Sequence, residues 1–157
     1  MIGSQGISSS GQRFGLPAPP NRTDGAFALM TELRRFASRY PRAVAAVLLC
    51  CAVAALFIGG AQPFAVNLIP APWDTFAHVA VFGAIGAALG IAIGIRRAGV
   101  PLMAAVGALA IGALDEWHQS LLPGRNAGWD DLAADAIGAL VAAFVVHGLR
   151  AVARRSN

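Results

Sequence analysis

The stretch from residue 115 to residue 138 reads DEWHQSLLPGRNAGWDDLAADAIG and separates two strongly apolar runs. It contains five of the eight acidic residues of the chain, one of its three histidines and a lone arginine. Polar groups placed beside long hydrophobic segments cost on the order of several kcal/mol each unless they are paired or functional. This stretch is therefore the first place to look for a functional site.

The composition of the 157-residue chain is typical of a one-domain membrane protein. The chain is 57% hydrophobic and 13% charged, whereas a soluble domain carries about 25% charged residues. Its twelve basic residues are all arginines, and they flank the hydrophobic runs. This placement indicates membrane topology rather than nucleic-acid binding. We therefore expect the lipid bilayer, and no nucleic acid, as the partner of this surface.

We predict three parts along the chain. Residues 1–25, rich in Gly, Ser, Pro and Gln, form a disordered tail. Residues 26–40 form a juxtamembrane amphipathic helix that lies on the lipid surface. Residues 41–157 form an all-α membrane domain whose four transmembrane helices cover about residues 43–60, 73–95, 100 onward and 132–149.

The third span is short of apolar residues. Its apolar run, residues 100–114, covers only about 22 Å at ~1.5 Å per residue, and the hydrocarbon core is about 30 Å thick. The helix must therefore continue through Asp115, Glu116 and Gln119, which places these side chains at the membrane interface.

The arginines predict the orientation of the spans. Eleven of them fall on one side of this arrangement and only Arg125 falls on the other, so the positive-inside rule places the N- and C-termini in the cytoplasm. Three tryptophans lie at the opposite, outer interface, as an aromatic belt requires: Trp73, Trp117 and Trp129. Six carboxylates, His78, His118, Gln119 and Arg125 then gather on the outer face.

Rows of small residues at four-residue steps follow His78 in the second span and precede Glu116 in the third. Such rows favour close helix crossings in membranes. We predict that the two spans pack on these rows and thereby bring His78 and Glu116 near each other. The rows are Gly86, Gly90 and Gly94 in the second span and Ala104, Ala108 and Gly112 in the third.

Asp74 and His78 share one helical face, one turn apart. A carboxylate in this position can orient an imidazole, as a general base or a ligand requires. Alternatively, the two residues form an interfacial pair that only anchors the end of the helix.

Glu116 and Gln119 lie one turn apart at the end of the third span, and Arg125 follows in a Pro-Gly turn. Arg125 has two interpretations. It forms a structural ion pair with Glu116 or Asp131, or its fork of donors holds an anionic group such as phosphate or carboxylate.

Asp130 and Asp131 precede the fourth span, where acids complement the helix dipole. Asp135 lies within the span, where no capping argument accounts for it. A carboxylate inside a membrane helix is a functional candidate by default.

Metal binding and nucleophilic catalysis have weaker support in the sequence. The side chains of His78, Glu116, Asp131 and Asp135 suit zinc or oxygen-preferring ions, but no pair has the spacing of a known metal signature. We therefore expect neither a metal nor a cofactor. Ser120 is the only hydroxyl near these residues, and the chain has no GxSxG motif.

Over about residues 73–140 the chain resembles the VanZ-like family of small bacterial membrane proteins. The resemblance lies in the order and spacing of four motifs: Asp74-x-x-x-His78, Glu116-x-x-Gln119, Pro123-Gly124-Arg125 and Asp131-x-x-x-Asp135-x-x-Gly138. The chain departs from the family at two positions, with Thr75 where the family usually has Lys and Asp135 where it usually has Asn.

The resemblance implies a multi-pass protein of the bacterial cytoplasmic membrane. The family is named for a protein associated with low-level resistance to the glycopeptide teicoplanin, and it offers no settled reaction. A role in the cell envelope or in antibiotic resistance is therefore what the resemblance implies.

We expect an outer-face site that binds an anionic envelope component bearing phosphate, carboxylate or D-amino-acid groups. Two alternatives remain open, namely a membrane enzyme acting on a lipid-linked envelope precursor and a structural or assembly subunit. His78 and Glu116 are the candidates for acid-base chemistry, and Arg125 is the candidate for holding the anion. The candidate binding residues are Asp74, His78, Glu116, Gln119, Arg125, Asp131 and Asp135.

Overall fold

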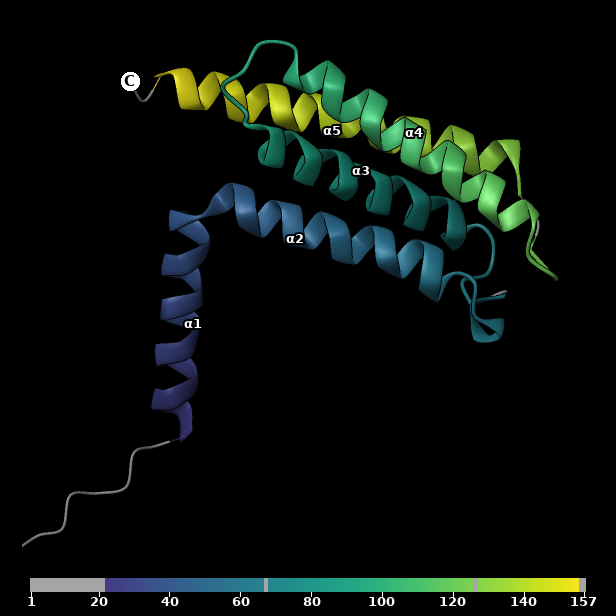
Figure 1. The fold of residues 1–157 in the computed structure, drawn as a ribbon, viewed down its shortest axis with the longest axis horizontal. Coiled ribbons are helices and arrows are strands. Elements are labelled where there is room, and N and C mark those ends of the chain that lie inside the picture. Colours follow the sequence, from purple (N-terminus) through teal and green to yellow (C-terminus); the bar gives the residue numbers. More distant parts are fainter. Residues whose placement is uncertain (1–21, 67, 126, 156–157) are drawn as a thin grey trace, which may run out of the picture. The chain divides into compact units, whose positions relative to one another are not determined.

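The structure, a computed structural model, describes residues 22–66, 68–125 and 127–155 (Figure 1). Within these ranges every regular element is a helix, which confirms the predicted all-α fold. The predicted disordered tail lies, up to residue 21, outside the described residues. The elements are α1 (Arg22–Arg39), α2 (Pro41–Ala54), the π-helix η1 (Ala55–Gly59), the 3-10 helix η2 (Pro63–Ala65), α3 (Trp73–Ile93), α4 (Val100–Ser120) and α5 (Trp129–Arg155).

Helix α1 lies where the amphipathic helix was predicted, but it begins at Arg22 rather than at residue 26 and ends at Arg39 rather than at residue 40. Glu32 and Arg35 form an ion pair of 2.7 Å on its surface. Five large apolar side chains of α1 are more than half exposed: Phe27, Leu29, Met30, Leu33 and Phe36. These are the side chains that an amphipathic helix would bury in a lipid surface, and this location stays a prediction.

The compact unit Ala37–Asn157 contains four helices that are long and apolar enough to cross a membrane. The first is Pro41–Gly59, which consists of α2 and η1 together, and the other three are α3, α4 and α5. The 21-residue helices α3 and α4 reach about 32 Å at ~1.5 Å per residue, enough for a hydrocarbon core of about 30 Å. The four predicted spans are confirmed.

Consecutive helices of this unit run in alternating directions, and α3 lies between α2 and the pair formed by α4 and α5 (Figure 1). Residues 60–72, 94–99 and 121–128 connect them, and the last two connections have the length expected between antiparallel neighbours. One end of the bundle therefore gathers the end of η1, the start of α3, the end of α4 and the start of α5.

The core forms where α5 packs against α3 and α4 through small residues. A Cβ atom added at Gly86 of α3 would lie 2.5 Å from the Cβ of Ala142 and 3.3 Å from that of Ala108. A Cβ atom at Gly90 would lie 2.5 Å from Cγ2 of Val146. The predicted contact between the small rows of α3 and α4 is therefore present at Gly86. At Gly90 the three atoms nearest to the added Cβ all belong to Val146, so this glycine packs against α5.

Large apolar side chains cover the outside of the four helices. At least 60% of the surface of each of Leu48, Phe76, Leu102 and Phe144 is exposed, one residue on each helix. Exposed apolar surface on this scale is what a lipid bilayer covers.

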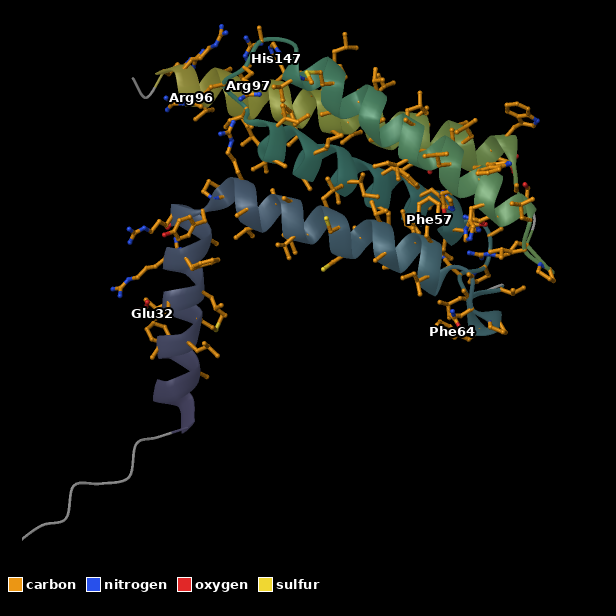
Figure 2. All side chains as sticks on the ribbon, viewed as in Figure 1. Glu32, Phe57, Phe64, Arg96, Arg97 and His147 are labelled. Atoms are coloured by element: carbon orange, nitrogen blue, oxygen red, sulfur yellow. The ribbon has the colours of Figure 1, made fainter. Side chains whose placement is uncertain are left out.

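The two ends of the bundle differ in charge. Arg42 donates a hydrogen bond of 2.8 Å to the carbonyl oxygen of Ile93 and so ties the start of α2 to the end of α3. Arg96, Arg97 and His147 lie at this same end, whereas Phe57 and Phe64 lie at the opposite one (Figure 2). The positive-inside argument requires such a separation. The side of the membrane that each end faces stays a prediction.

Candidate functional site

A cavity of about 640 Å³ opens at the end of the bundle opposite Arg96 and Arg97. Part of its wall is apolar and comes from η1 and the segment after it, including Leu56, Phe64 and Leu68. The helix that contributes this wall changes from α to π at Ala55, a feature often found at functional sites. The polar part of the wall consists of Asp74, His78, Asp115, Gln119, Arg125 and Asp131.

The imidazole of His78 is held by a carboxylate from another helix. Its Nδ1 atom lies 2.8 Å from Oδ1 of Asp135 on α5, whose side chain is completely buried. Of the two alternatives for Asp74, orientation of His78 is not the one that the structure shows: among the described residues the carboxylate bonded to His78 is that of Asp135, and Oδ1 of Asp74 accepts a hydrogen bond from the backbone N–H of Thr75. Asp74 remains at the start of α3, where a carboxylate complements the helix dipole.

Glu116 joins the same cluster from α4. His78, Glu116 and Asp135 each offer one atom suited to metal binding, and these three atoms lie within 4.8 Å of one another. The predicted proximity of His78 and Glu116 is thereby confirmed. Oε2 of Glu116 also accepts a hydrogen bond of 2.9 Å from the N–H of Gly128. This bond fastens the loop before α5 to the end of α4.

Gln119 pairs with Asp115, the other acid at the end of α4. Its amide nitrogen donates a hydrogen bond of 2.7 Å to Oδ2 of Asp115, and both side chains are buried. Asp115 thus belongs to the site, although it was not among the predicted binding residues. The signal was available, because residues four apart on a helix lie on one face.

Arg125 comes directly after Pro123 and Gly124, which form the turn that the sequence predicts. Gly124 has a φ of 77°, which a residue with a side chain rarely adopts, and the N–H of Arg125 donates to the carbonyl oxygen of Leu122. Nη1 of Arg125 donates a hydrogen bond of 3.1 Å to the carbonyl oxygen of Ala65. The guanidinium also lies against Gly60, where an added Cβ atom would be 3.4 Å from Nη2.

The ion pair of Arg125 with Glu116 or Asp131, one of its two predicted roles, does not form. Among the described residues no carboxylate makes a salt bridge with Arg125. Its Nε atom is buried and has no hydrogen-bond partner within the described part of the chain. The guanidinium therefore lines the cavity with N–H groups that form no hydrogen bond among the described residues.

Five of the seven predicted binding residues line the cavity, namely Asp74, His78, Gln119, Arg125 and Asp131. The other two, Glu116 and Asp135, are buried next to His78. His118 takes no part in this wall and packs its ring 5.2 Å from that of Phe57, measured between centroids.

The fold and the cavity define a multi-pass helical membrane protein with a polar site at one end. Comparison of the chain with protein-family models, curated proteins and solved structures gives no match. The resemblance to the VanZ-like family accordingly rests on the four sequence motifs.

Proposed function

We propose that this chain is a VanZ-like protein of the bacterial cytoplasmic membrane that binds an anionic envelope component in the cavity. The observation that carries the proposal is the guanidinium of Arg125, which lines the cavity without a carboxylate partner among the described residues. Arginine is the side chain best suited to hold a phosphate or carboxylate through two parallel hydrogen bonds.

The other residues of the cavity wall indicate which further chemical groups the ligand carries. Leu56, Phe64 and Leu68 offer an apolar surface, which suits a lipid chain or another hydrophobic group. Asp74 and Asp131 line the same cavity and can accept hydrogen bonds from hydroxyl or ammonium groups. The ligand is therefore an amphiphile with an anionic group and several donors, such as a lipid-linked sugar or D-amino-acid derivative. Protection against cell-envelope stress, including teicoplanin, is the expected consequence.

A complementation assay tests this function. The gene is deleted, and wild type or the Arg125→Ala variant is returned to cells that are challenged with cell-envelope stresses, teicoplanin among them. Removal of one charge-assisted pair lowers ligand affinity roughly 10- to 100-fold, so Arg125→Ala should protect no better than the empty vector. Its level in the membrane is measured in parallel.

Arg155→Ala is the matched control for this assay. Arg155 lies at the end of α5, and the cavity wall does not include it. The control should protect like wild type. Full protection by Arg125→Ala at a normal membrane level would remove the anion-binding role of Arg125.

The bond between His78 and Asp135 favours a second candidate, an enzyme that acts on a lipid-linked envelope precursor. An imidazole held by a buried carboxylate is the arrangement of a general base, and His78 lines the cavity. An enzyme would change the lipid composition of the cell, whereas a binding protein would not. Mass spectra of lipid extracts should then show an unprocessed precursor that accumulates equally in the deletion strain and in cells with His78→Ala. An unchanged lipid profile would exclude the enzyme and leave the binding protein.

A further inference from the structure

Three side chains from three helices meet next to the cavity: His78 of α3, Glu116 of α4 and Asp135 of α5. One nitrogen or oxygen atom of each lies within 4.8 Å of the other two. Ligand atoms bound at about 2.0–2.2 Å from one tetrahedral ion lie roughly 3.3–3.6 Å apart. Side-chain movements of at most about 1 Å therefore suffice to place all three atoms around one ion.

Both carboxylates of this cluster have an unused oxygen. Only 8% of Glu116 and none of Asp135 is exposed. Oε1 of Glu116 and Oδ2 of Asp135 are buried and have no hydrogen-bond partner among the described residues. Buried polar atoms are almost always satisfied in folded proteins. Two such atoms in one cluster indicate a missing partner.

Charge balance indicates that the missing partner is a cation. Two buried carboxylates without counter-charges are strongly unfavourable. His78 can neutralise one of them when it is protonated, and the described residues supply no arginine to the cluster. A divalent cation would neutralise both carboxylates and would replace the proton that His78 and Asp135 share.

We propose that His78, Glu116 and Asp135 bind a divalent cation, Zn²⁺ or Mn²⁺. One imidazole nitrogen and two carboxylates form a mixed donor set that suits these ions better than Mg²⁺, which prefers oxygen ligands and retains its water. Three protein ligands leave further coordination positions for water or for a group of the bound molecule. His78 is the member of the set that lines the cavity, so the ion sits at the cavity wall.

This proposal does not rest on anion binding by Arg125, and the two can fail separately. The Arg125→Ala variant is expected to keep the ion. A protein that binds the ion but gives no protection in cells would contradict only the proposed function, and the reverse result would contradict only the metal site.

Metal content of the purified full-length protein tests the site. The protein is extracted in detergent with a tag that contains no histidine, stripped with chelator, incubated with Zn²⁺ or Mn²⁺ and desalted. Inductively coupled plasma mass spectrometry should find about one ion per chain in wild type. Glu116→Gln, which keeps an acceptor for the N–H of Gly128, should lower the affinity at least 10-fold, as should Asp135→Asn.

The other histidines and an exposed acid provide matched controls. His118→Gln, His147→Gln and Asp130→Asn should all retain one ion per chain, because these residues lie outside the cluster. Fewer than about 0.1 ions per wild-type chain with both metals would overturn the site, whatever the variants do. Equal metal content in Glu116→Gln and His118→Gln would overturn it as well.

A second measurement covers the case in which a variant does not fold. Zn²⁺ or Mn²⁺ should raise the melting temperature of the chelator-stripped wild-type protein, because an ion that binds only the folded state stabilises that state. Mg²⁺ at the same concentration should raise it far less. An equal shift with Mg²⁺, or no shift with any of the three ions, would contradict the proposed donor set.

Discussion

Gly138→Leu is expected to abolish accumulation of folded protein. A Cβ atom at residue 138 would lie 2.6 Å from the carbonyl oxygen of Val79 and 2.9 Å from the nitrogen of Gly83. Both are backbone atoms of α3, which cannot turn aside as a side chain can. Helix α5 must therefore move away from α3, and this close contact between the two backbones is lost. Even Gly138→Ala should destabilise the protein by about 3 kcal/mol.

The measurement is the fraction of detergent-extracted protein that elutes as a single species, together with its melting temperature. Gly148→Leu is the matched control on the same helix, because a Cβ atom at Gly148 has no neighbour within 4 Å. It should accumulate like wild type. Gly83→Ala, whose Cβ atom would meet the carbonyl oxygen of Gly138 at an ordinary 3.5 Å, should have a small effect. Normal accumulation of Gly138→Leu would show that α3 and α5 do not pack at this point.

Asp135→Ala should cost about 3 kcal/mol of stability, because it leaves the partly buried His78 without its hydrogen-bonded carboxylate. Asp135 is completely buried and lies 2.8 Å from Nδ1 of His78. Asp135→Asn should cost less than about 1.5 kcal/mol, because the amide oxygen can still accept the hydrogen bond from His78. Melting temperatures are compared in the presence of a chelator, so that they report the pair without a bound ion.

Asp130→Ala is the control for a lost acid on the same helix. Asp130 is exposed in the first turn of α5, where a carboxylate contributes less than about 1 kcal/mol through the helix dipole. A double-mutant cycle of His78→Ala with Asp135→Ala should give a coupling energy above about 1 kcal/mol. Equal stabilities of Asp135→Ala and Asp130→Ala would mean that the pair does not support the fold.

The sequence predicted correctly which residues meet at one end of the bundle. In several cases it did not predict which of these residues form hydrogen bonds with one another. Asp74 is one turn from His78 along the chain, yet His78 bonds to Asp135, 57 positions away. The difference depends on how α3 and α5 are rotated about their axes. No local pattern of residues specifies that rotation.

Gln119 and Arg125 illustrate the same limit. Spacing alone allows Gln119 to pair with Asp115 or with Glu116, and the structure selects Asp115 because Glu116 turns toward His78 and Gly128. Spacing also allows Arg125 to form an ion pair with either of two acids. In the structure it reaches Ala65 instead, because the segment between η1 and α3 passes beside the turn at Gly124.

By itself, the sequence determined the four membrane helices and the end of the bundle at which the polar residues gather. The reason is that apolar runs of about 20 residues must cross the bilayer, so that consecutive spans alternate in direction. Only the tertiary structure decided that His78, Glu116 and Asp135 form one cluster while Arg125 makes no salt bridge with a carboxylate of the described residues. These contacts depend on the rotation of each helix, and the glycines fix that rotation by allowing close approach at only a few points.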